Sequence, residues 1–249
     1  MEPHSVYVCS PELLQKAGAI ANKNNVPVII HVAETEREVA EVMGKYGRTP
    51  VAHLADMGIL GPKLIADHCV VLTPEDIALL KEFDVKVAHN PESNMKLASG
   101  IAPIPELLDH GITVGIGTDG CASNNNLDLF QEMDTAAKLH KVNSLDPTVM
   151  DARTVVRMAT IDGARVLGLE DTTGSLETGK KADVIIVDIG SPHLVPMYNT
   201  YSHLVYSVTG SDVVTAIVNG RLLMEDRVLT TIDVDAVMKA VNQIAENIT

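Results

Sequence analysis

The hydrophobic pattern alternates between two kinds of segment over the first 120 residues. Short apolar runs rich in β-branched residues lead to His31, His68, His89 and Asp119, and such runs are typical of buried parallel strands. Between them, apolar residues recur at helical spacing after capping residues or proline. This alternation predicts a parallel sheet with right-handed crossovers.

Several helices and two polar loops are predicted in this part of the chain. The helices cover residues 11–24, 35–46, 50–57, 74–83, 103–110, 127–142, 147–158 and 162–167, and the loops cover residues 90–100 and 121–126. Only four strands are visible, whereas a closed (β/α)8 barrel takes about 250 residues by itself. The expected fold class is therefore α/β, with a partial (β/α)8 TIM barrel.

The pattern changes after residue 173. One strand is predicted at Val184–Val187, and two more at residues 213–218 and 222–229. The last two are separated by Asn219-Gly220, a dipeptide typical of a tight hairpin turn. An amphipathic helix follows at residues 234–248. We therefore expect a small antiparallel β unit beside the α/β part.

Composition narrows the classes of partner. The 249 residues can bury a sizeable core, and the formal charge of -14 argues against a nucleic acid or an anionic membrane surface as partner. We also predict no membrane-spanning segment and no secretory leader. Three widely spaced cysteines, Cys9, Cys69 and Cys121, suit free thiols in a reducing compartment. The expected location is the cytoplasm.

Chemically reactive side chains gather where the strands end. His31 and Glu34 lie at the end of one strand and in the loop beyond it, while His68 and Asp119 end two others. A single histidine at such a place is more often a core residue than a ligand, but independent core histidines have no reason to recur at one edge. Two histidines and an aspartate suit a divalent metal such as zinc, with the glutamate left free for proton transfer.

Longer motifs carry a resemblance over essentially the whole chain. They are HVAET, DHCVVL, AHNPESNMKLASGIAP, GIGTDGCASNNNLDLFQEM, GSLETGKKADVIIVD and SHLVYS. This set resembles the amidohydrolase superfamily, and within it the 5-methylthioadenosine/S-adenosylhomocysteine deaminases. The resemblance implies a (β/α)8 barrel with a β-sandwich formed by both chain ends. It also implies hydrolytic deamination of an adenine nucleoside to the inosine analogue and ammonia.

The resemblance assigns a role to five residues. His31 and Asp119 are expected to bind the metal, which is zinc or, as alternatives, iron, manganese or nickel. Glu34 is expected to transfer protons and to hold the substrate base, and His68 to hydrogen-bond the oxygen of the addition intermediate. Asp119 is also expected to take the proton of the attacking water and to contact the substrate. His4 is expected to contact the substrate as well.

The sequence departs from the family pattern at its start. It contains no His-x-His pair, which in the family supplies two further metal ligands from the first barrel strand. The resemblance divides the chain into a carboxyl-terminal barrel half at residues 1–172, a β-sandwich portion with a connecting segment at 173–230, and a C-terminal helix at 231–249. We expect a fragment of a longer enzyme, inactive alone because catalytic zinc sites usually have three protein ligands.

Other interpretations stay open at this point. The chain could be one half of a split enzyme whose partner chain supplies the other half of the barrel, or a non-catalytic binding subunit. The activity could be that of another aminohydrolase, of the triazine or guanine type. The expected partner is a small nucleoside, either 5-methylthioadenosine, S-adenosylhomocysteine, 5'-deoxyadenosine or adenosine, and a homo-oligomer is a further expectation by analogy.

Overall fold

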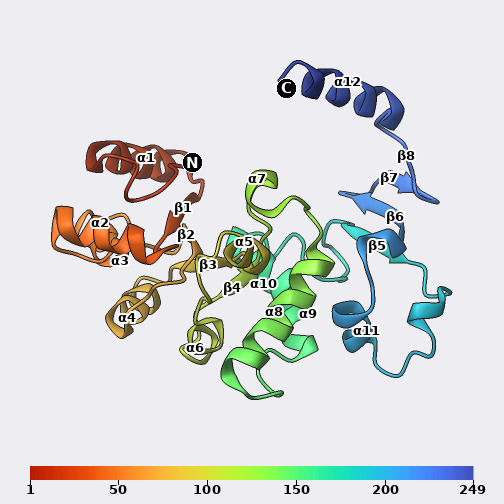
Figure 1. Ribbon diagram of the computed structural model, residues 1–249, viewed down its shortest axis with the longest axis horizontal. Coiled ribbons are helices and arrows are strands. Elements are labelled where there is room, and N and C mark those ends of the chain that lie inside the picture. The colour runs from red at the N-terminus through yellow and green to blue at the C-terminus, as the bar shows by residue number, and fades with distance from the viewer. Residues whose placement is uncertain (249) are drawn as a thin grey trace.

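Four parallel strands form the sheet that positions the functional side chains (Figure 1). In this computed structural model, which describes residues 1–248, the strands are β1 (Val28–Val32), β2 (Leu64–His68), β3 (Lys86–His89) and β4 (Val114–Ile116). They lie in sequence order, and each pairs with the next in parallel. The predicted α/β class and parallel sheet are confirmed. Thr249, the last residue of the predicted C-terminal part, lies outside the described residues.

The first residues of the chain run beside β1. The His31 N–H donates to the His4 carbonyl at 3.0 Å, and the Ile29 N–H donates to the Met1 carbonyl at 2.9 Å. Ser5 forms a parallel bridge with His31. This backbone pairing places the His4 side chain next to the end of β1.

Helices connect the strands, and their boundaries follow from their caps. The described helices of this part are α1 (Pro11–Asn24), α2 (Glu36–Tyr46), α3 (Pro50–Asp56), α4 (Pro74–Glu82), α5 (Pro91–Lys96), α6 (Ile104–Asp109), α7 (Cys121–Asn124), α8 (Leu129–Ser144), α9 (Ala152–Ala159) and α10 (Ile161–Leu167). The side chains of Ser10, Thr35, Thr49 and Thr73 cap α1 to α4. The helices predicted at 11–24, 35–46, 50–57 and 74–83 are thereby confirmed to within a residue or two.

The structure differs from the predicted local structure in several places. The segments 90–100 and 121–126, expected as loops, contain the short helices α5 and α7. The strand expected at 222–229 is divided into β7 (Arg221–Glu225) and β8 (Val228–Leu229), because Asp226 and Arg227 between them have left-handed backbones. A helix that was not predicted, α11 (Thr200–Tyr206), follows the first strand of the second sheet.

The two faces of the parallel sheet are covered differently. Alternate residues such as Ile30, Val32 and Ala66 belong to the buried core. Residues of the other face, among them Ile29 and Ile65, line a cavity of about 800 Å³ that α8 to α10 and β5 also border. Helix α10 approaches β4 closely, since a Cβ atom on Gly115 would lie 3.0 Å from the Gly163 Cα.

The rest of the chain forms a second, antiparallel sheet. Its strands lie in the order β5 (Val184–Val187), β6 (Val213–Val218), β7 and β8. The predicted hairpin at Asn219-Gly220 joins β6 to β7. Helix α12 (Val234–Glu246) has no buried residue and stands apart from the sheets in Figure 1. None of the helices in residues 1–248 has the length and apolar character needed to cross a membrane.

Candidate metal and proton-transfer site

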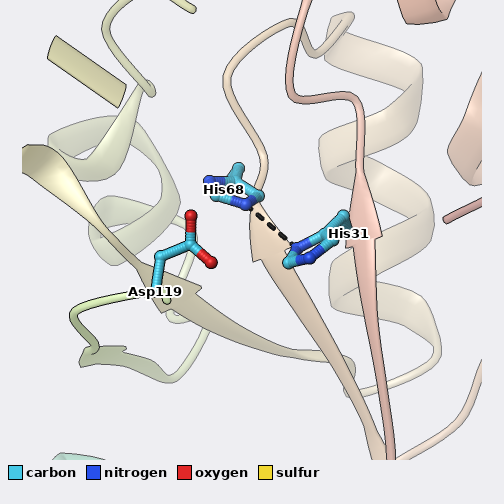
Figure 2. A group of neighbouring side chains, drawn as sticks. All are labelled: His31, His68 and Asp119. Carbon is cyan, nitrogen blue, oxygen red and sulfur yellow. Dashed lines mark hydrogen bonds between the residues drawn. The ribbon is translucent and has the colours of Figure 1, made fainter. Parts of the chain in front are cut away.

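The ends of the parallel strands bring together three of the predicted site residues (Figure 2). His31 lies in β1, His68 is the last residue of β2, and Asp119 follows β4. One ligand atom from each lies within 4.8 Å of the others. Among the described residues, these three side chains form a group that could hold a metal ion. The prediction that these side chains share one edge is therefore confirmed as geometry.

The backbone at this edge is strained where it delivers the side chains. Ala33, His68, Cys69 and Asp119 all have left-handed backbones, with φ of 52°, 69°, 49° and 58°. Such conformations cost non-glycine residues of order 1–3 kcal/mol each and cluster at functional sites. The N–H groups of Cys69 and Val70 donate to the carbonyls of Val32 and Ala33, at 3.1 and 3.0 Å. These bonds hold the ends of β1 and β2 together.

The hydrogen bonds of His68 determine which ring nitrogens carry protons. Its Nδ1 lies 2.8 Å from the Asn94 Oδ1, and its Nε2 lies 3.0 Å from the His31 Nδ1. Because an amide oxygen only accepts, the His68 Nδ1 carries a proton, and in the neutral ring Nε2 accepts from the His31 Nδ1–H. The Nε2 lone pair of His31 is then free to bind a metal.

The surroundings favour the charge states that a metal ligand needs. Burial, and then the nearby His68, lower the pKa of His31, which favours the neutral ring. Burial alone would raise the pKa of Asp119. However, its Oδ2 accepts hydrogen bonds from Ser123 Oγ at 2.6 Å and Ser93 Oγ at 2.7 Å, and these donors hold its pKa below the ordinary value. Asp119 is therefore an ionised carboxylate at neutral pH.

Glu34 lies on the turn that follows β1, and it accepts a hydrogen bond from Ser99 Oγ at 3.1 Å. The turn is fixed by Glu38 of α2. The Glu38 carboxyl is buried and accepts from the N–H groups of Ala33 at 3.0 Å and Glu34 at 2.7 Å. Burial raises the pKa of Glu38 to about 7. Glu38 was not predicted as a site residue, although its position in the first turn of the next helix was a signal for capping.

His4 lies at the mouth of the site. Its exposed ring meets the His31 ring edge to face, with ring centroids 5.0 Å apart. This position suits contact with a bound molecule. His89, which the pattern places at the end of a strand, instead lies fully buried behind the edge, with its Nε2 3.0 Å from that of His140.

Other residues of the site were also missed from the sequence. Asp67 precedes His68, and its Oδ2 lies 3.5 Å from the His31 Nδ1. Burial, then the charges of Asp119 and Glu2, raise the pKa of Asp67 to about 8. Asn94 and Ser93 were assigned to a loop, so their contacts with the site were not predicted.

The donor set fits part of a zinc site. Imidazole nitrogen and carboxylate oxygen are both common zinc ligands, and His31 and Asp119 offer one of each. Catalytic zinc usually has three protein ligands and an open position. His31 and Asp119 would therefore supply part of the ligand set.

Comparison with known proteins supports the resemblance. Residues 1–223 match the protein family described as "Amidohydrolase family". The 5-methylthioadenosine/S-adenosylhomocysteine deaminase of Syntrophobacter fumaroxidans is 59% identical over 248 residues, which are 100% of this chain and 57% of that protein. The 5'-deoxyadenosine deaminase of Methanothermobacter thermautotrophicus is 50% identical, over 99% of this chain and 57% of that protein.

Solved structures agree. A zinc-bound adenosine deaminase from Xanthomonas campestris matches with a TM-score of 0.96 and 38% identity, over 99% of this chain and 56% of that one. The zinc complex of atrazine chlorohydrolase TrzN from Arthrobacter aurescens matches with a TM-score of 0.91 and 28% identity, over 98% and 54%. This chain thus spans a little over half the length of the relatives that it matches. With a family match over most of its residues, the chain belongs to the amidohydrolase family.

Proposed function

We propose that this chain supplies the carboxyl-terminal half of the active site of a hydrolytic deaminase of adenine nucleosides. The observation that carries the proposal is the convergence of His31, His68 and Asp119, with Glu34 on the adjoining turn. It occurs in a chain 59% identical to a 5-methylthioadenosine/S-adenosylhomocysteine deaminase. The products would be the inosine analogue and ammonia.

The proposed cofactor is one divalent metal, most simply zinc, held by His31 and Asp119 together with ligands from outside this chain. When bound, such a metal lowers the pKa of its water far below the ordinary value, toward about 7, which supplies hydroxide at neutral pH. Zinc is favoured over iron, manganese or nickel because two structural relatives contain it.

The residues of this chain would move the protons. Asp119, ionised because of its two serine donors, accepts the proton of the attacking water. As the water oxygen bonds to the amine-bearing ring carbon, Glu34 protonates the adjacent ring nitrogen. His68, which lies beside His31, would hydrogen-bond the oxygen of the addition intermediate. The proton on Asp119 passes to the amine, and the carbon–nitrogen bond breaks to release ammonia. The proton left on the attacking oxygen passes to Glu34 as the carbonyl forms, which restores the starting state of Glu34.

We propose that the substrate is an adenine nucleoside, with His4 and Glu34 holding it at the mouth. The relatives are named for 5-methylthioadenosine, S-adenosylhomocysteine and 5'-deoxyadenosine, which favours substrates altered at the 5' position. We further propose the division into parts at 1–172, 173–230 and 231–249, and a homo-oligomer or a partner chain that completes the barrel. Three free cysteines are compatible with the cytoplasm.

A substrate panel tests the proposal. The zinc-loaded protein, expressed at the full length encoded in its source, is incubated with each nucleoside and with an amino-substituted triazine, and ammonia release is measured. We expect release from adenine nucleosides, accompanied by the ultraviolet change of adenine to hypoxanthine. Release from the triazine alone would support the alternative suggested by the 28% identical hydrolase. No release from any of them would refute the deaminase proposal.

A further inference from the structure

Two short helices hold two of the three clustered side chains. Helix α5 supplies Asn94, which accepts from His68, and Ser93, which donates to Asp119. Helix α7 supplies Ser123, which donates to the same oxygen of Asp119. The orientation of His68 and Asp119 therefore depends on where α5 and α7 lie.

These helices have little stability of their own. They contain six and four residues, and neither has a hydrogen bond from the side chain of its N-cap residue. Isolated helices shorter than about 12 residues are marginal in water, and the first N–H groups of any helix need acceptors from outside it. Contacts with the rest of the fold must therefore fix both helices.

The carboxyl of Glu132 makes those contacts. This side chain in the first turn of α8 is fully buried, and its Oε2 accepts the Glu92 N–H at the start of α5 at 3.1 Å. Its Oε1 accepts from Asn124 Nδ2 on α7. Asn124 Nδ2 also donates to the carbonyl of Thr118 at 2.8 Å, directly before Asp119. One carboxyl group thus joins α5, α7 and the residue that precedes Asp119.

Helix α8 is itself firmly placed. Ala136 and His140, on the same buried face as Glu132, are 0% and 1% exposed. His140 pairs with His89 at the end of β3, and Thr135 Oγ1 donates to the Glu92 carboxylate at 3.2 Å. The position of Glu132 is therefore fixed relative to the sheet that carries the site.

We infer that Glu132 is a positioning residue, which holds α5 and α7 so that Asn94 and the two serines orient His68 and Asp119. The inference rests on the proposed function for its effect on turnover. Both donors to Glu132 are neutral amides, and burial raises its pKa to about 7. Burying a carboxyl group costs free energy. The positioning role explains why Glu132 is nevertheless buried, because its two oxygens bind α5 and α7.

The test is Glu132→Gln in the full-length zinc protein, with Asp134→Asn as its control. Glutamine keeps one acceptor oxygen, but its N–H₂ group replaces the other oxygen. Either the Glu92 N–H or Asn124 Nδ2 therefore loses its acceptor. Loss of an outer partner of a metal site typically costs about 10- to 100-fold in activity. We expect kcat to fall by about that factor and KM to stay within about threefold, because His4 and Glu34 come from other elements. Asp134 lies on the same helix but pairs with the exposed Lys138, so its variant should match the wild type.

A second variant and a second readout keep the test decisive. Asn124→Ala removes the α7 bond and leaves the bond to Glu92, so it serves if Glu132→Gln does not fold. The ¹⁵N signals of the His68 ring, assigned by their loss in His68→Gln, report its tautomer without turnover. We expect them to change in Glu132→Gln or Asn124→Ala but not in Asp134→Asn.

Three results would overturn the inference: unchanged His68 signals, kcat within about twofold of the wild type, or an equal loss in the control. If the wild-type protein deaminates no nucleoside, the proposed function fails. The His68 signals then still decide the role of Glu132, because they do not require turnover.

Discussion

Glu38 should give the protein a pH-dependent stability that one substitution removes. Its carboxyl is 2% exposed, and burial raises its pKa from 4.5 to about 7. Between these values the folded protein binds more protons than the unfolded chain. The stabilisation is therefore fully present below about pH 4.5 and is lost as the pH rises through about 7. Glutamine at this position cannot ionise, so Glu38→Gln lacks this dependence.

The magnitude follows from the size of the change in pKa. Each pH unit between the unfolded and folded pKa values is worth up to about 1.4 kcal/mol. The stabilisation from Glu38 therefore falls by about 2–3 kcal/mol between about pH 5 and about pH 8. Denaturant unfolding at about pH 5 and about pH 8 measures the free energy of unfolding of the wild type and the variant. The wild type should lose about 2–3 kcal/mol more than Glu38→Gln over this interval.

A matched control lies one turn away on the same helix. Glu41 is exposed and pairs with Arg37 at 2.8 Å, so Glu41→Gln should keep the pH dependence of the wild type. The reasoning is refuted if the wild type and Glu38→Gln lose the same free energy of unfolding between the two pH values. Burial would then not govern the charge of this carboxyl.

Three further predictions concern the site. Asn94→Ala leaves the buried His68 Nδ1–H without its acceptor, so the free energy of unfolding should fall by about 1–3 kcal/mol. The exposed control Asn24→Ala should lose less than about 0.5 kcal/mol, and equal losses in the two variants would contradict the prediction. Replacing Ser93 and Ser123 together by alanine should raise the pKa of Asp119, so the acid limb of the pH dependence of kcat/KM should move to higher pH. An acid limb that stays in place would show that these two donors do not lower the pKa of Asp119. Removing the metal with a chelator should abolish deamination and added zinc should restore it, whereas turnover by metal-free protein would rule out metal-dependent chemistry.

The common edge of the site could be predicted because parallel strands place their carboxyl ends together. Short apolar runs located β1 to β4. The shared edge of His31, His68 and Asp119 then followed from the rule for parallel strands alone. The N-terminal ends of helices could also be predicted wherever a serine or threonine caps them.

The supporting residues could not be predicted in the same way. Helices α5 and α7 are too short to show a helical period, so Asn94 and Ser93 were assigned to a loop. Glu38 and Glu132 look like ordinary polar positions of amphipathic helices. Their burial depends on which elements pack against them, and that is a property of the tertiary structure.

We propose that this chain provides the proton-transfer half of an adenine nucleoside deaminase. The most direct test compares ammonia release from 5-methylthioadenosine by the wild-type full-length zinc protein, Glu34→Gln and Glu36→Gln. Glu36 is exposed and is the first residue of α2, two residues after Glu34. We predict that Glu34→Gln loses about 100-fold or more of kcat, as expected when a general acid is removed, while Glu36→Gln matches the wild type. A Glu34→Gln variant that deaminates at the wild-type rate would contradict the account.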